Sequence, residues 1–135
     1  MGRIEEIAEI HHKCLIEEFK MIGIEVSINS QHLKEKWKKN QDNIRTFTQG
    51  GKVIGFITTD SEPMIYVDPE HQRQGIGGKL LKISNVKSVW VMKGNEKAEN
   101  FYKKNGFKPT ISRETIKLRH EITEIKWVKD ENNTT

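Results

Sequence analysis

The sequence predicts a mixed α/β domain, on three observations. Apolar residues in the segment 3–22 recur at three- and four-residue steps, as in an amphipathic helix. The segment 44–67 holds three β-rich runs, the first two separated by a pair of glycines. Helix-like and strand-like runs alternate from there on. Because no repeat or linker interrupts this order, we expect a single domain over residues 1–128, followed by a polar tail over residues 129–135.

The first half of the chain predicts two helices and three strands. Gly23 can end the first helix, and Ser30 can cap a short second one. His11 lies on the apolar stripe of the first helix and is interpreted as a partly buried histidine rather than a ligand or base. The run at 44–59 predicts a hairpin that turns at its two glycines. Pro63 suits the first position of a third strand, since proline lacks a donor for the ladder.

The second half predicts a helix, a strand, a helix and a hairpin. A short helix begins near Gly75, and the run "SVWVM" at 88–92 predicts a strand. The run "NEKAENFYKKNGF" predicts a second helix that Gly106 ends. Two alternating runs in the segment 114–129 predict a final hairpin that turns near His120.

Composition excludes several classes of protein. The chain of 135 residues is 34% hydrophobic and 31% charged, and none of its apolar runs approaches the roughly 20 residues of a membrane span. Its first residues lack the apolar core of a signal peptide. Cys14 is the single cysteine, so no internal disulfide can form and we expect a cytoplasmic setting. The net charge of +4 favours anionic partners, including phosphate-bearing cofactors.

The stretch "VDPEHQRQGIGGKLL", residues 67–81, places glycines where a strand gives way to a helix. It fits neither a Walker loop nor the G-x-G-x-x-G dinucleotide pattern. It does fit Q/R-x-x-G-x-G/A, through Gln72, Gly75 and Gly77. A helix start with unpaired N–H groups and no blocking side chain suits a pyrophosphate. On this stretch alone, a tight turn without a ligand remains an equal alternative.

A second segment decides between the two readings. In "NEKAENFYKKNGF" the residues Asn95, Ala98, Tyr102, Gly106 and Phe107 follow the spacing N-x-x-A-x-x-x-Y-x-x-x-G-F. The two segments, in this order with one strand between them, resemble the two signatures of the GCN5-related N-acetyltransferase (GNAT) superfamily. The resemblance covers about residues 44–108. The helix after the glycines is shorter than is usual in that family.

The resemblance implies an acyl-CoA N-acyltransferase fold, with a mixed, mostly antiparallel sheet flanked by helices. Acetyl-CoA would lie between two splayed parallel strands, here 64–67 and 89–92, and no metal is implied. The backbone of the first strand would pair with the pantetheine arm, Asn95 would contact that arm, and Tyr102 would protonate the departing thiolate. The implied cofactor-binding residues are Ile65, Tyr66, Val67, Gln72, Arg73, Gln74, Gly75, Ile76, Gly77, Gly78, Asn95 and Tyr102.

The implied activity is transfer of an acetyl group from acetyl-CoA to a primary amine by direct attack. Glu62 is the carboxylate best placed to act as the base, ahead of Asp60, Asp68 and His71, and ordered water is an alternative. The acceptor, a small molecule or a protein amine, is not specified by the sequence. The edge of the final hairpin is compatible with a homodimer.

Two other functions compete with this one. A protein with this fold can bind an acyl-CoA as a sensor or regulatory module without transferring the acyl group. Nucleic-acid binding is disfavoured, because the lysines of the segment 34–39 do not alternate with several aromatic residues.

Overall fold

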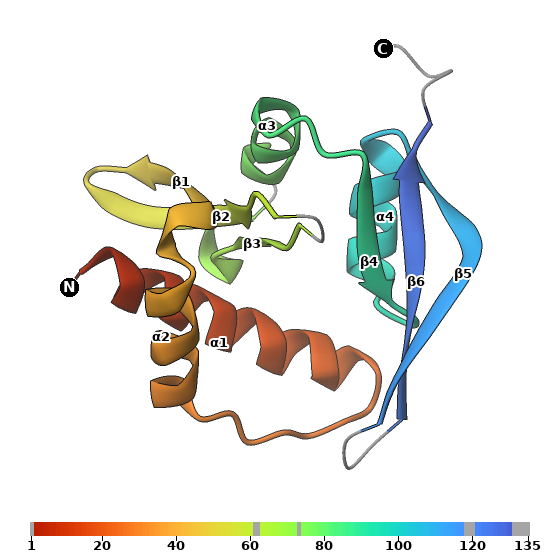
Figure 1. The fold of residues 1–135 in the computed structure, drawn as a ribbon, viewed down its shortest axis with the longest axis horizontal. Helices are drawn as coiled ribbons and strands as arrows, with labels where there is room; N and C mark the ends of the chain where they lie inside the picture. Colours follow the sequence, from red (N-terminus) through yellow and green to blue (C-terminus); the bar gives the residue numbers. More distant parts are fainter. Residues whose placement is uncertain (1, 61–62, 73, 118–120, 131–135) are drawn as a thin grey trace. The chain divides into compact units, whose positions relative to one another are not determined.

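The computed structural model of the chain describes residues 2–60, 63–72, 74–117 and 121–130 (Figure 1). These residues form two compact units, Met1–Asn85 and Val86–Thr135. Each unit contains its own three-stranded antiparallel sheet. The order of helices and strands along the chain is the predicted one, with two short 3-10 helices added.

The first unit begins with α1 (Arg3–Met21), which buries its apolar stripe against the core. The predicted helix end at Gly23 is confirmed. Gly23 has φ 78°, and its N–H donates to the Lys20 carbonyl at 3.0 Å. The N–H of Ile24 donates to the Phe19 carbonyl at 2.9 Å. This pair of bonds is a Schellman motif, which satisfies carbonyls at the helix end.

The second helix, α2 (Ser30–Lys39), is capped by Asn29, so the prediction of Ser30 as the cap is wrong by one residue. The Asn29 side chain accepts hydrogen bonds from the backbone N–H groups of Gln31, at 3.0 Å, and His32, at 3.2 Å. Asn and Ser are equally good caps, so their order in the sequence does not identify which of them precedes the helix.

The first sheet contains β1 (Ile44–Gln49), β2 (Lys52–Thr58) and β3 (Ile65–Val67) in that spatial order. The predicted hairpin is confirmed, and its glycines Gly50 and Gly51 have φ of 60° and 77°. Both central residues of a type I′ turn need such values, which glycine adopts without strain. The central strand, β2, is buried from its second residue onward.

The third strand begins at Ile65, two residues after the predicted start at Pro63. Met64 still contacts β2, because its carbonyl accepts from the Thr58 N–H at 2.9 Å. Its own N–H, however, donates to the Thr58 hydroxyl Oγ1 at 2.7 Å. A side-chain oxygen thus takes the place of a backbone partner, and the ladder ends there.

A short 3-10 helix, Gln41–Asn43, precedes β1, and a second one, Pro69–His71, follows β3. The helix α3 (Ile76–Ile83) has eight residues, which agrees with the short helix predicted. Its first residue packs on β2 at Gly55, where an added Cβ would lie 3.3 Å from Cγ2 of Ile76.

The second unit contains β4 (Ser88–Met92), α4 (Glu96–Lys104), β5 (Phe107–Lys117) and β6 (Glu121–Lys129). Its strand order is β4-β6-β5, as the right-hand sheet in Figure 1 shows. The final hairpin is confirmed, although β5 begins at Phe107 rather than at Glu114. An irregularity between Pro109 and Arg113 breaks the alternation that would have marked the strand start. The turn predicted near His120 lies outside the described residues.

Candidate functional site

The connection from β3 to α3 carries the first signature. We call its described residues, 68–72 and 74–75, the β3–α3 turn. Gly75 is the N-cap of α3 and is left-handed, with φ 77° and ψ 7°. No described side chain caps this helix, and its first internal bond runs from the Lys79 N–H to the Gly75 carbonyl at 3.1 Å. The backbone N–H groups of residues 76–78 therefore precede the helical ladder and are donors for an anion.

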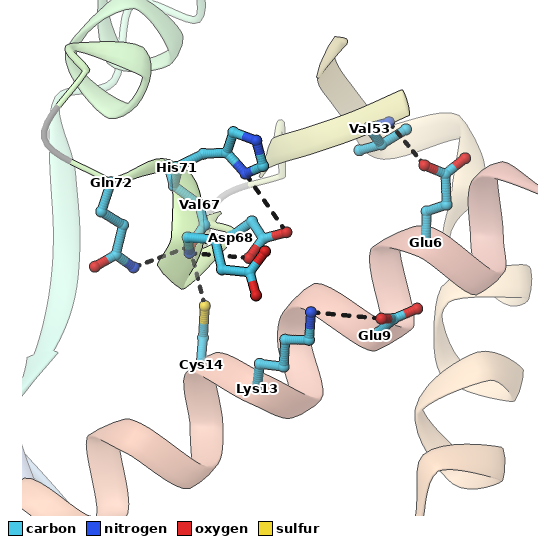
Figure 2. A network of polar contacts seen from close by, with 10 residues as sticks. Glu6, Glu9, Lys13, Cys14, Val53, Val67, Asp68, His71 and Gln72 are labelled. Carbon is cyan, nitrogen blue, oxygen red and sulfur yellow. Dashed lines mark hydrogen bonds and ion pairs between the residues drawn. The ribbon is translucent and has the colours of Figure 1, made fainter. Parts of the chain in front are cut away.

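Asp68 fixes the start of this turn, as Figure 2 shows. Its side chain is buried, and the carboxylate oxygen Oδ1 accepts from the Glu70 N–H at 3.1 Å. Its other oxygen, Oδ2, lies 3.7 Å from Nδ1 of His71, and its carbonyl accepts from the His71 N–H at 2.8 Å. Asp68 and His71, two of the weaker base candidates, thus hold the 3-10 helix together.

The Val67 carbonyl accepts two side-chain hydrogen bonds (Figure 2). The amide nitrogen Nε2 of Gln72 donates at 2.9 Å, and the Sγ thiol of Cys14 donates at 3.3 Å from α1. Gln72 belongs to the predicted signature, but nothing in the sequence pairs Cys14 with the end of β3. This contact joins residues that lie far apart in the chain, and no local pattern could have revealed it.

Successive residues of β3 direct their backbone N–H and C=O groups alternately toward β2 and away from it. Tyr66 lies opposite Phe56, while Ile65 and Val67 lie opposite Ile57 and Gly55. Since the Asp68 N–H donates to the Ile54 carbonyl and the Thr58 N–H to the Met64 carbonyl, the ladder bonds fall on alternate residues. The N–H and C=O groups of Ile65 and Val67 therefore point away from β2. Apart from the Val67 carbonyl, which already accepts from Gln72 and Cys14, they are arranged to pair with an extended ligand.

The remaining predicted residues of this unit divide into described and undescribed ones. Gln74 is exposed, Ile76 and Gly77 are buried, and Gly78 is partly buried. Glu62, the preferred base candidate, and Arg73 lie outside the described residues.

The second signature spans one whole helix of the second unit. Asn95 is 3% exposed and caps α4, its Oδ1 accepting from the Ala98 N–H at 3.1 Å. Gly106, with φ 85°, follows the other end. Tyr102 is 7% exposed, and its ring packs against those of Phe101 and Phe107, whose centroids are 5.1 and 5.6 Å from its own. The spacing of the signature is therefore that of a helix with its two ends and its buried face.

His11 is buried completely, not partly as predicted from its place on the helix stripe. Its Nδ1 accepts a hydrogen bond from Nε1 of Trp37 at 3.0 Å, and the ring of Tyr66 packs 4.8 Å from its own. Burial, with a smaller contribution from the charges of Lys36 and His12, lowers the pKa of His11 to about 3. At neutral pH, His11 is an uncharged core residue.

Two further features of the described residues bear on function. None of their helices is both long enough and apolar enough to cross a membrane. In the same part of the chain, His, Cys, Asp and Glu side chains form no group of three or more suited to a metal ion.

Comparisons with known proteins agree with the two signatures. The family description "Acetyltransferase (GNAT) domain" matches residues 40–109, slightly more than half of the chain. No curated protein matches the sequence.

Solved structures show the same fold at low sequence identity. PH1933 from Pyrococcus horikoshii OT3 aligns with TM-score 0.63 and 22% identity over 98% of this chain and 94% of its own. YjaB from Escherichia coli, solved in its apo form, aligns with TM-score 0.67 and 20% identity over 94% of this chain and 92% of its own. The yncA protein from Salmonella typhimurium, solved with its cofactor acetyl-CoA, aligns with TM-score 0.53 and 16% identity over 95% of this chain and 92% of its own. Fold, signatures and family match together establish that this chain belongs to the GNAT acetyltransferase family.

Proposed function

We propose that this protein is an N-acetyltransferase that moves the acetyl group of acetyl-CoA to a primary amine by direct attack. One observation carries the proposal. The left-handed Gly75 opens α3 at the end of the β3–α3 turn, so that uncapped backbone donors stand at the family's pyrophosphate signature. The relative from Salmonella typhimurium, which was solved with acetyl-CoA as its cofactor, supports the choice of ligand.

The family resemblance assigns a role to each group of residues. The N–H groups at the start of α3 would bind the pyrophosphate, with the positive end of the helix dipole behind them. The outward N–H and C=O of Ile65 and the outward N–H of Val67 would pair with the pantetheine amides. One such N–H, aimed at the thioester oxygen, would stabilise the oxyanion by about 3–4 kcal/mol. Asn95 would bind the pantetheine arm in addition to capping α4.

The reaction requires two proton transfers. An alkyl ammonium is only about 0.04% neutral at pH 7, so Glu62 or an ordered water must accept its proton. The amine nitrogen then forms a bond to the acetyl carbon, and the carbon–sulfur bond breaks. The departing thiolate takes a proton from the Tyr102 hydroxyl, which solvent restores. Holding the two reactants in this geometry can lower the barrier by about 7–11 kcal/mol.

Thermal unfolding with and without acetyl-CoA tests the cofactor. A ligand at 100 times its dissociation constant adds about 2.7 kcal/mol, which should raise the midpoint of a domain this size by roughly 6–15 °C. Gly77→Glu should abolish the rise, because its carboxylate would stand where the pyrophosphate binds. The midpoint of that variant without ligand reports whether it folds. A wild-type midpoint that acetyl-CoA leaves unchanged would contradict the proposal.

Release of free thiol in the presence of varied amines tests the transfer itself. Tyr102→Phe should lower turnover by roughly 10²–10⁴-fold, the usual contribution of a positioned acid, while acetyl-CoA affinity stays within a small factor. Equal turnover in the two proteins would remove Tyr102 from the reaction. Tight acetyl-CoA binding with no thiol release from any amine would instead indicate a sensor or regulatory module.

We further propose a cytoplasmic enzyme whose catalytic domain is the single domain over residues 1–128. The lone thiol of Cys14 supports the first point, since it needs no oxidising compartment. A homodimer is part of the same proposal, and sedimentation of the purified protein over a range of concentrations would test it.

A further inference from the structure

We propose that Gln72 and Cys14 are positioning residues for cofactor binding, which act by holding the Val67 carbonyl from two sides. The inference rests on the proposed function, because it takes the β3–α3 turn to be part of the pyrophosphate site. Neither residue needs to touch the cofactor for this role. Their common target is one backbone oxygen at the point where the chain leaves the sheet.

The position of Val67 explains why its carbonyl needs partners. Val67 lies opposite Gly55, and the next ladder bond is made by the N–H of Asp68 to the Ile54 carbonyl at 2.8 Å. The Val67 carbonyl therefore points away from β2. A carbonyl has two lone pairs, and here the donors of Gln72 and Cys14 provide a partner for each.

The Gln72 bond closes the turn on itself. It links residue 72 back to residue 67 at 2.9 Å. Inside the closed segment, Asp68 accepts from the N–H groups of Glu70 and His71. The conformation up to Gln72 is thereby fixed, and this segment leads to Gly75 and the donors of α3.

The Cys14 bond ties the same carbonyl to a rigid helix. Cys14 is 6% exposed and lies on the core-facing stripe of α1 with Ile7 and Ile10. A thiol that is buried to this degree offers little surface to a ligand of the turn. An effect of Cys14 on cofactor affinity must therefore pass through Val67.

Two pairs of variants test the inference. Gln72→Met keeps the length of the side chain and removes its donor, and Cys14→Ala removes the thiol. Gln49→Met is the control for Gln72→Met, because it makes the same substitution at an exposed position at the end of β1. Ile7→Val trims a buried α1 side chain that belongs to the apolar core. Unfolding midpoints of all four show how much each change costs in stability alone.

The first measurement uses the ligand-free protein. Backbone hydrogen exchange at Glu70 and His71 should become at least about threefold faster in Gln72→Met and in Cys14→Ala, since each loses a bond that orders the turn. Both controls should exchange at the wild-type rate. Wild-type exchange in Gln72→Met and Cys14→Ala alike would overturn the inference.

The second measurement is the dissociation constant for CoA by calorimetry. It should rise about fivefold in Gln72→Met and about threefold in Cys14→Ala, the range of a neutral hydrogen bond and of a weaker thiol donor. In the double variant, the dissociation constant should rise by less than the product of the two single factors, because both bonds end on one oxygen. Cys14→Ser, which restores a donor, should recover part of the affinity.

The outcomes separate this inference from the proposed function. Weaker binding in Gln72→Met with wild-type affinity in Cys14→Ala would make Gln72 a direct ligand contact and overturn the positioning role. Faster exchange without any loss of affinity would overturn the link to the cofactor. A wild-type protein that does not bind CoA would refute the proposed function, and exchange would still decide whether the two bonds order the turn.

Discussion

At the scale of single residues, His11 shows how burial changes the chemistry of a side chain. Its ring nitrogen Nδ1 accepts from Trp37, so the neutral form is the one that the core accommodates. The native pKa of about 3 lies well below the ordinary value of 6.5. Protons therefore bind more readily to the unfolded chain than to the folded one at mildly acidic pH.

The free energy of unfolding should consequently depend on pH through His11. The stability that neutral, buried His11 contributes is fully present above pH 6.5 and is lost as the pH falls from 6.5 toward 3. Between pH 7 and pH 5 the loss should be about 2 kcal/mol. His11→Gln keeps an acceptor for Trp37 but does not titrate. The free energy of unfolding of this variant, measured with urea, should therefore fall less steeply with decreasing pH than that of the wild type over the same range. Parallel curves for the two proteins would exclude His11 as the source.

Single residues also mark the limit of prediction from sequence. The signatures identified Gly75, Asn95 and Tyr102, because helix ends and helix faces have short-range patterns. The partners of Cys14 and His11 come from other elements, and only packing brings them together. Burial of His11 was underestimated for the same reason, since a helix stripe does not show how deeply it is covered.

At the scale of elements, the start of α3 depends on one backbone conformation. Gly75 has φ 77°, and an added Cβ there would meet no atom within 4 Å. A substitution at this position therefore tests backbone strain without a steric clash.

Gly75→Ala should lower the free energy of unfolding by about 1–2 kcal/mol, the cost of the left-handed conformation for a residue with a Cβ. Gly75→Asn should cost less, since asparagine adopts this conformation more readily. Chemical denaturation of both variants provides the comparison. Equal losses would mean that strain at residue 75 is not what destabilises the helix start.

The order of elements was predictable, whereas several of their ends were not. The hairpin glycines and the helix-ending glycines have local causes and were placed correctly. The start of β3 depends on the Thr58 hydroxyl, and the start of β5 is hidden by the irregularity between Pro109 and Arg113. Both depend on a partner strand that the local sequence does not contain.

At the scale of the whole molecule, the prediction of one domain over residues 1–128 can be tested by cooperativity. If it holds, α1 in the first unit and β6 in the second should lose protection at the same urea concentration. Pulsed hydrogen exchange with peptide-level mass spectrometry follows both elements in one experiment. Two separate midpoints would contradict the single-domain prediction.

The family was predictable at this scale because its signatures lie in two contiguous segments. The acceptor was not, because an acceptor pocket is formed by side chains from distant segments whose packing has no sequence pattern. The base candidate Glu62 illustrates the difference, since its assignment depends on position in the chain alone.

Gly55 shows how a ligand site can restrict the residue type at a position that does not contact the ligand. A Cβ there would lie 3.3 Å from Cγ2 of Ile76, the first residue of α3, so that a larger side chain would push on the start of that helix. In a scan of all substitutions selected for cofactor binding, position 55 should accept only the smallest residues and reject bulky ones, as a contact residue does. A map of tolerance would then extend the binding surface into the middle of a buried strand, where no ligand atom can reach.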